Sequence, residues 1–191
     1  MNITAEQFRQ LAYPNMPAAL VHTWAEKLSA ALAGSHIDTP LRASHFMAQA
    51  LQESGRFLYT QEIWGPTPQQ LKYDPASGSQ LSKELGNVHP GDGYLFRGRG
   101  VFETTGRGNY RLTGQRLGID LEAHPDQMAE IGVGSLGACD FWTHHGLTAL
   151  ADRGGLAQVA PITRLVNGGY TGLLERQQFF RQAAKLFGAP I

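Results

Sequence analysis

Two carboxylates nine residues apart are the side chains in this sequence best suited to chemistry. Glu53 ends a predicted helix and interrupts an apolar face that includes Phe46 and Ala50. Partial burial and the negative end of the helix dipole both disfavour ionisation, so we expect a raised pKa for Glu53. Glu62 lies beyond Gly55 in a predicted exposed loop. Glycoside hydrolysis requires such a pair, with one carboxyl protonated and the other ionised.

The spacing of these two residues does not decide the matter by itself. The chain has 16 acidic residues, so pairs of this kind are easily found. A glutamate at a helix end can also bury only its stem and keep its carboxylate in solvent. On these residues alone, both the catalytic and the structural interpretation remain open.

The helix that carries Glu53 has well-defined ends. Thr39 is a good N-cap, Pro40 suits the first helical position, and Gly55 suits the left-handed residue after a helix. Further helices are predicted after Thr4 and over 17–32, 69–73, 109–117, 125–144, 161–165 and 173–187. Only 94–96 and 101–102 have the character of short strands. The predicted fold class is therefore mainly α, an α+β chain with minor short strands.

Length and charge limit the classes of function. The 191 residues fit one domain, 1–191, without a second module. Sixteen basic residues balance 16 acidic ones, so we expect no nucleic-acid partner. The segment 97–116 is locally basic because it has five arginines against Glu103. That segment suits an anionic substrate, or it forms a solvated face.

Neither a metal site nor a cofactor site is predicted. Cys139 is the only cysteine and is expected to be a small buried hydrophobe. His144 and His145 are adjacent, so on a helix they point about 100° apart and do not share an ion. The N-terminus has no signal-peptide core, and no apolar run approaches the ~18 residues of a membrane span. We expect synthesis in the cytoplasm and no stable membrane insertion.

Four segments in the same order carry a resemblance to a known family. They are TPLRASHFMAQALQESGRF, GDGYLFRGRGVFETTGRGNY, ITRLVNGGYTG and LLERQQFF, and they span about residues 36–187. Together they resemble glycoside hydrolase family 19, the chitinase class that includes phage endolysins. The compact length, the PGDG entry to the RGRG segment and the missing signal peptide resemble the endolysins more than the plant chitinases.

The resemblance implies a lysozyme-like fold with a substrate cleft between two lobes. It implies that one catalytic domain, with no separate wall-binding module, hydrolyses β-1,4 bonds beside N-acetylated sugars with inversion. For an endolysin the substrate is the glycan strand of peptidoglycan. Such a protein is a monomer that acts on the cell wall in the periplasm after holin-dependent release.

The resemblance also assigns roles position by position. Glu53 matches the general acid, Glu62 the general base, and Thr105 the hydroxyl residue that helps hold the attacking water. The matched substrate-binding positions are Asn109, Asn167 and Arg176, and the weaker cleft-lining matches are Tyr94, Arg99 and Tyr110.

Glu103 departs from the family pattern, which usually has glutamine there. We expect Glu103 to line the cleft as a sugar contact. We also expect it to be ionised at neutral pH because Arg99 or Arg107 lies nearby.

Several alternatives remain at this stage. The chain also suits a chitinase acting on N-acetylglucosamine polymers. The Gln-Glu-Ser sequence at a helix end also resembles lytic transglycosylases, which need no water-activating base and leave anhydro ends. A wall-binding module without catalysis needs only aromatic and arginine side chains. A delivered antibacterial toxin would use the same chemistry as an endolysin.

Overall fold

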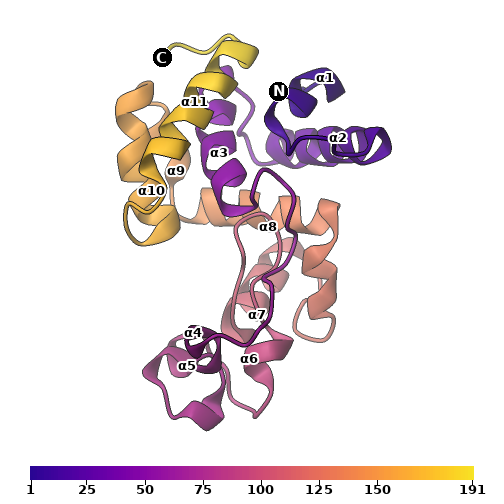
Figure 1. Ribbon diagram of the computed structural model, residues 1–191, viewed down its shortest axis with the longest axis vertical. Coiled ribbons are helices and arrows are strands. Elements are labelled where there is room, and N and C mark those ends of the chain that lie inside the picture. Colours follow the sequence, from indigo (N-terminus) through magenta and orange to yellow (C-terminus); the bar gives the residue numbers. More distant parts are fainter.

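The computed structural model describes all 191 residues and is built from short helices (Figure 1). In chain order the elements are α1 Ala5–Leu11, α2 Ala18–Gly34, α3 Pro40–Glu53, α4 Pro68–Leu71, η1 Pro75–Ser77, α5 Gln80–Glu84, α6 Asp92–Leu95, α7 Arg107–Leu117, η2 Pro125–Ala129, α8 Ile131–His144, α9 Leu147–Ala151, η3 Leu156–Gln158, α10 Val159–Asn167 and α11 Leu173–Phe187. The mainly α fold class is thus confirmed.

The helices form a larger body and a smaller lobe joined by a narrow waist (Figure 1). The larger body holds α1 to α3 and α9 to α11, and both chain termini lie there. The smaller lobe holds α4 to α6, while α7 lies in the waist and α8 crosses the base of the larger body. The chain ends α3 in the larger body and then runs down the waist into the smaller lobe. Glu53 and Glu62 therefore lie on successive parts of that path.

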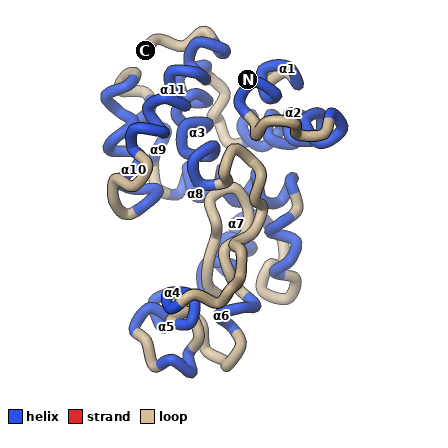
Figure 2. The backbone as a smooth tube through the Cα atoms, viewed as in Figure 1, coloured by secondary structure: helices blue, strands red, loops and turns tan.

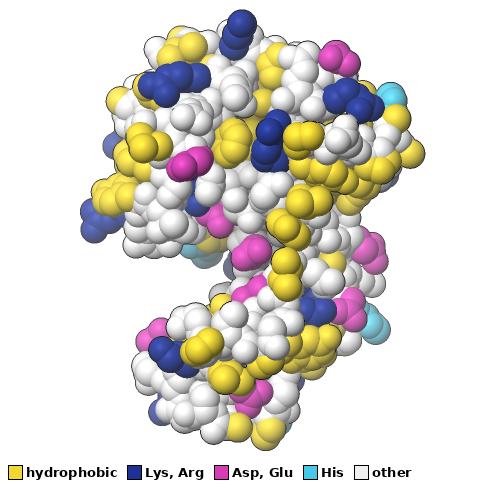
Figure 3. All heavy atoms as spheres, viewed as in Figure 1, with side chains coloured by type: hydrophobic (Ala, Val, Ile, Leu, Met, Phe, Trp, Pro, Cys, Tyr) yellow, Lys and Arg dark blue, Asp and Glu magenta, His cyan; other side chains and the backbone are white.

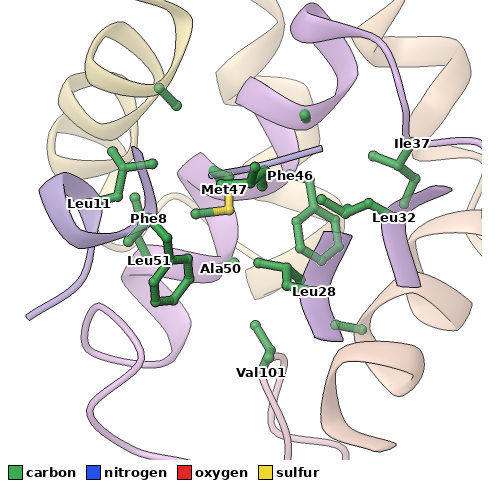
Figure 4. Packing of buried hydrophobic residues seen from close by; sticks show 14 of the residues in the cluster. Phe8, Leu11, Leu28, Leu32, Ile37, Phe46, Met47, Ala50, Leu51 and Val101 are labelled. Carbon is green, nitrogen blue, oxygen red and sulfur yellow. The ribbon is translucent and has the colours of Figure 1, made fainter. Parts of the chain in front are cut away.

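The centre of the larger body is α3, which is packed on several sides. Its side is covered by α11, and the residues from Ala43 to Leu51 are all buried. Figure 4 shows Phe46, Met47 and Leu51 among side chains from α1 and α2. The apolar stripe predicted for this helix is confirmed, because Phe46 and Ala50 are fully buried. This packing fixes the end of α3 and so the position of Glu53.

Thr39 and Gly55 bound α3 as their types predict. The Thr39 hydroxyl accepts a hydrogen bond from the backbone of Arg42, and Pro40 is the first helical residue. Gly55 follows the helix end with φ +58°. Local capping rules were therefore sufficient to place this helix.

The predicted strands are absent, and loops fill the waist (Figure 2). Tyr94 and Leu95 belong to α6, and Val101 and Phe102 form a turn. The extended pairing that exists is two isolated antiparallel bridges, which join Arg99 to Gln61 and to Thr104. The prediction of strands at 94–96 and 101–102 was wrong, because the first stretch belongs to a helix and the second to the tight turn between Arg99 and Thr104.

Two of the helix predictions for the C-terminal third of the chain need correction. The stretch 125–144 is broken at Glu130, whose backbone is extended, so a short 3-10 helix precedes α8 in place of one continuous helix. Gly134 packs directly on Gly100: a Cβ atom added at Gly134 would lie 3.0 Å from Gly100 Cα, and one added at Gly100 would lie 3.2 Å from Gly134 Cα. The helix predicted to begin at Pro161 begins at Val159. The last helix, predicted over 173–187, is confirmed as Leu173–Phe187.

No helix of the structure is long and apolar enough to cross a membrane.

Candidate active site

Glu53 is the last residue of α3, and its carboxylate contacts a buried arginine from α11. Arg176 Nη2 donates to Glu53 Oε1 at 2.5 Å. The Glu53 side chain is 19% exposed, whereas that of Arg176 is 2% exposed. A charge-assisted bond of this kind holds the carboxylate in one orientation. Residues 123 positions apart thus form one unit at the helix end.

A second layer of polar contacts holds Arg176 in turn. Its Nη1 donates to Gln49 Oε1 at 2.6 Å, and Gln49 Nε2 donates to Thr163 Oγ1 at 3.2 Å. Gln49, Thr163 and Arg176 are all buried. The resemblance implies a substrate-binding role for Arg176. In the structure its guanidinium is buried and binds Glu53 and Gln49, so Arg176 does not contact substrate directly.

The backbone after Glu53 turns sharply. Gly55, Arg56 and Phe57 all have positive φ, at +58°, +61° and +66°. Such values are uncommon outside glycine and persist only where surrounding contacts enforce them. Arg56 Nε donates to the Leu11 carbonyl oxygen at 2.8 Å, and Phe57 packs on Phe8. The turn directs the chain into the waist, where Glu62 lies.

Glu62 lies beside Gly98, in the extended part of the waist. The Glu62 amide donates to the Gly98 carbonyl oxygen at 2.8 Å, and the Gly98 amide donates to Glu62 Oε2 at 3.2 Å. The Tyr73 hydroxyl donates to Glu62 Oε1 at 3.4 Å. Glu62 takes part in no ion pair within the protein. Its environment therefore differs from that of Glu53, which has a cationic partner.

Glu103 lies on the other side of Gly98 from Glu62, and its predicted charge state needs correction. Burial raises the pKa of Glu103 to about 7, and the negative charges of Glu62 and then Glu53 add to the effect. The predicted stabilisation of an ionised Glu103 by Arg99 or Arg107 was wrong. Both arginines are already paired with other carboxylates.

Salt bridges to other carboxylates keep these arginines from stabilising an ionised Glu103. Arg107 pairs with Asp92 at 2.6 Å and with Glu122 at 3.0 Å. Arg99 is buried and pairs with Asp126 at 2.6 Å. Arg116, from the same segment, pairs with Asp140 at 2.7 Å. Three of the five arginines of the segment 97–116 are thus neutralised, so the segment does not present the open basic surface that its composition suggested.

Two of the weaker cleft-lining matches are also corrected. Tyr110 is fully buried, and its hydroxyl accepts from Arg99 Nη1 at 3.1 Å and donates to the Arg97 carbonyl oxygen at 2.7 Å. Arg99 is 1% exposed. Both residues support the loop beneath Gly98 and do not line a cleft.

The third weaker match, Tyr94, is exposed. It lies in a groove with Glu62, Trp64 and Arg97, and the Arg97 guanidinium lies 4.3 Å from the centre of its ring. The ring of Trp64 contacts Tyr94 edge-on, with ring centres 5.4 Å apart. This aromatic surface therefore lies in the same groove as Glu62.

A second groove begins at Glu103 and runs between α7 and α8. Thr105 and Asn109 line it together with Glu103. The Thr105 hydroxyl donates to the Glu103 carbonyl oxygen at 2.7 Å, and Asn109 Nδ2 donates to the Thr105 carbonyl oxygen at 2.7 Å. The Thr105 hydroxyl oxygen and the Asn109 amide oxygen both retain acceptor capacity. Asn167 is exposed at the end of α10, in the larger body, and does not line this groove.

Two further residues belong to the site but were not singled out from the sequence. Gln49 lies one helical turn before Glu53, so its i, i+4 spacing was a usable signal. Tyr73 gave no comparable signal, since it follows the short helix α4. Burial raises the pKa of Tyr73 to about 12, with contributions from the charge and hydrogen bond of Glu62 and from the charge of Glu103.

The space-filling view shows a hollow between the larger body and the smaller lobe, with acidic side chains at the waist (Figure 3). Glu62 and Glu103 lie in this waist, and Glu103 is close enough to Glu53 to be influenced by its charge. The arrangement offers a carboxylate held by arginine and a second carboxylate with only hydrogen-bond donors. Such a pair is able to deliver one proton and accept another.

Known proteins resemble this chain both in sequence and in fold. A glycosyl hydrolase family 19 domain-containing protein of Haemophilus influenzae is 29% identical over 162 residues, which cover 74% of this chain and 78% of the relative. Chitinase C from Streptomyces griseus superimposes with a TM-score of 0.72 at 21% identity, covering 98% of this chain and 93% of the other. The chain is a glycoside hydrolase that resembles family 19 in sequence and in fold.

The fold of this hydrolase recurs in further solved structures, which are described as chitinases. A bacterial family 19 chitinase matches with a TM-score of 0.71 at 20% identity, covering 99% of this chain and 96% of the other. A class IV family 19 chitinase from Zea mays matches with a TM-score of 0.63 at 18% identity, covering 99% and 92%. No family model matches the chain. The hydrolase has no group of three or more His, Cys, Asp or Glu side chains arranged to hold a metal ion.

Proposed function

We propose that this hydrolase cleaves β-1,4 bonds between N-acetylated sugars of bacterial peptidoglycan, in the manner of an endolysin, and inverts the anomeric configuration. The family supports hydrolysis of a glycan. The choice of peptidoglycan rests on the resemblance of the PGDG and RGRG segments to endolysins. In this proposal a monomer reaches the cell wall after holin-dependent release and needs no nucleic acid.

The observation that carries the proposal is the placement of two separately held carboxyls, Glu53 at the end of α3 in the larger body and Glu62 in the waist. Glu53 is held by Arg176 at the end of a buried helix. Glu62 is held by the Gly98 amide and the Tyr73 hydroxyl in the waist. Inverting glycosidases need two carboxyls with different duties and enough room between them for water.

The proposed reaction moves two protons. The Glu53 carboxyl donates its proton to the glycosidic oxygen as the bond from that oxygen to the anomeric carbon breaks. Glu62 accepts a proton from water, whose oxygen forms the new bond to the anomeric carbon from the opposite face. The Thr105 hydroxyl lies beside Gly98, where it is able to help hold that water. Asn109 offers its amide oxygen to sugar in the groove that begins at Glu103.

Chitin is the second candidate substrate. The solved structures of similar fold are described as chitinases. Their sequence identity to this chain is about one fifth, so the likeness extends to the fold and leaves the preferred glycan open to test. Both polymers have β-1,4 bonds beside N-acetylated sugars, and one reaction scheme serves both.

Mass spectrometry of the products distinguishes the candidates. Purified peptidoglycan and chitin oligosaccharides are incubated with the wild-type protein and with a folded Glu53→Gln variant. The proposal expects muropeptides with reducing ends from the wild-type protein and about 100-fold less product from the variant. Anhydro ends would identify a lytic transglycosylase, and cleavage of chitin alone would identify a chitinase. Binding to the wall without any new ends would identify a binding module.

A further inference from the structure

Three side chains of the site surround a single glycine, Gly98. An added Cβ atom at this residue would lie 3.3 Å from Glu103 Cβ, 3.4 Å from Glu62 Cβ and 3.3 Å from Thr105 Oγ1. Glu62 and Glu103 therefore flank the same backbone position from two sides. The extended pairing of the waist enforces this, because residue 99 bridges to Gln61 on one side and to Thr104 on the other.

The backbone of Glu103 is held in a conformation that directs this side chain toward Gly98. Its φ is +49°, a left-handed value that is uncommon for a residue with a Cβ atom. The Thr105 hydroxyl fixes the Glu103 carbonyl oxygen, and the backbone of residue 104 pairs in both directions with residue 99. A conformation of this kind at an active site is retained only where the surrounding structure determines it.

No cation faces the Glu103 carboxylate. The titratable and charged groups around it are Glu62, Glu53 and Tyr73 on the waist side, and Arg116, Asp140, His144 and His145 in the groove beyond. Of these, Arg116 is bound to Asp140 through two hydrogen bonds of 2.7 Å. Glu103 takes part in no ion pair. Two neighbouring carboxylates without a cation between them are not readily ionised together.

We propose that Glu103 and Glu62 hold a single proton between them at neutral pH, and that Glu103 is the positioning residue that keeps Glu62 ionised to accept a proton from water. The inference rests on the proposed role of Glu62 as the base. It gives Glu103 a function that a glutamine at the same position would fill with its amide. A protonated carboxyl and a glutamine amide are both neutral hydrogen-bond donors.

The proton count of a reaction cycle is consistent with this pair. The pair begins with one proton, on Glu103. Glu62 accepts a second from the attacking water while Glu53 gives one to the leaving oxygen. The second proton then leaves the pair to solvent, and Glu53 regains one from solvent. Glu103 keeps its proton throughout, so its contribution acts through Glu62.

The proposal is tested by carbon-13 NMR titration of the glutamate carboxyl carbons in the intact protein. Burial and the neighbouring charges raise the pKa of Glu103 to about 7, so one carbon should titrate with that midpoint. This signal should be missing in Glu103→Gln and unchanged in Glu84→Gln, which changes an exposed carboxylate of α5. In Glu62→Gln the Glu103 midpoint should fall, because its charged neighbour is removed.

Three outcomes would overturn the proposal. The first is that every glutamate titrates in its ordinary range of about 4 to 5. The second is that the midpoint near 7 survives in Glu103→Gln, and the third is that Glu62→Gln leaves it unchanged. The titration needs no substrate, so it stands even if the peptidoglycan assignment fails.

A kinetic measurement separates positioning from a merely structural role. Glu103→Gln keeps a neutral donor and should lose less than about tenfold in kcat/KM at pH 6, whereas Glu103→Ala should lose more. A structural role would instead lower the thermal stability of both variants without restoring activity in the glutamine variant. Equal loss in the two variants at equal stability would also contradict the proposal.

Discussion

Arg176 Nη2 lies 2.5 Å from Glu53 Oε1, and this contact joins the start of the last helix to the end of the central one. The ion pair gives Glu53 a fixed orientation that α3 alone does not provide. The site therefore has two parts: Glu53 and Arg176 lie on packed helices, whereas Glu62 lies on the loops of the waist.

Replacing Glu53 with glutamine should reduce hydrolysis at least ~100-fold while the protein remains folded. Positioned general acid catalysis contributes roughly 10² to 10⁴, and glutamine keeps the size of the side chain without a transferable proton. The rate is measured on the glycan that the product analysis identifies, with folding checked by circular dichroism. A folded variant with a near wild-type rate would remove Glu53 from the mechanism.

Replacing Arg176 with methionine should lower both activity and stability. The loss of a buried partner should cost roughly 3 kcal/mol in the free energy of unfolding, the low end for such pairs because Glu53 keeps some solvent contact. Displacement of the Glu53 carboxyl should lower kcat by about 100-fold. Urea unfolding and steady-state kinetics provide the two measurements.

Arg181→Met is the matched control for this experiment, since Arg181 is an exposed arginine of the same helix. The control should change neither quantity appreciably. If both arginine variants behaved alike, the contact with Glu53 would have no special role.

Glu62→Gln should lower kcat far more than Glu103→Gln. The base takes a proton from water in each turnover, and its loss should cost at least ~100-fold. Glu103 acts through its neighbour, so its glutamine variant should retain most of the turnover. An inactive Glu103→Gln variant beside an active Glu62→Gln variant would transfer the base assignment to Glu103.

The product should have inverted anomeric configuration. If Glu62 activates water on the face opposite Glu53, the two carboxyls of the working enzyme should stand about 6.5 to 9.5 Å apart. Proton NMR of fresh product from a soluble oligosaccharide reports the configuration before mutarotation. Retention would require a separation of about 5 Å and a nucleophilic carboxylate.

His45 should make the fold sensitive to mild acid. Burial holds the pKa of His45 below its ordinary value of 6.5, and the hydrogen bond of its Nε2 to the Gly154 carbonyl oxygen opposes this only in part. The unfolded chain therefore binds more protons as the pH falls below 6.5, and the stability present above that pH is lost. For one proton the slope is at most about 1.4 kcal/mol per pH unit.

Urea unfolding at pH 7.5 and 5.5 checks this expectation. His45→Gln should reduce the loss of stability between these pH values, and His22→Gln, which changes an exposed histidine, should not. Proton NMR of the wild-type protein gives an independent measure, because the His45 ring should titrate below 6.5. A midpoint above 6.5 would contradict the prediction.

The parts of the fold that could be predicted from sequence depend on local chemistry. Thr39, Pro40 and Gly55 bound α3 through capping rules that need no knowledge of the remainder of the chain. Cys139 is buried, and its pKa is raised to about 12 by that burial. The α3 stripe followed from helical periodicity in the same way.

The parts that could not be predicted depend on contacts between distant segments. The charge state of Glu103 is an example, because Arg99 and Arg107 form salt bridges with Asp126 and Asp92 and not with Glu103. Local composition counts those arginines as available. The break at Glu130 likewise accompanies the close approach of Gly134 to Gly100, two residues far apart in the sequence.

Substitution of Gly98 should affect the active site without affecting the fold. Its φ does not require glycine, and an alanine methyl group would need shifts of only a few tenths of an ångström from its neighbours. Those neighbours are Glu62, Glu103 and Thr105, so the same methyl group would displace all three. In a saturation library scored separately for solubility and for hydrolysis, position 98 should therefore accept small residues by the first score and reject them by the second.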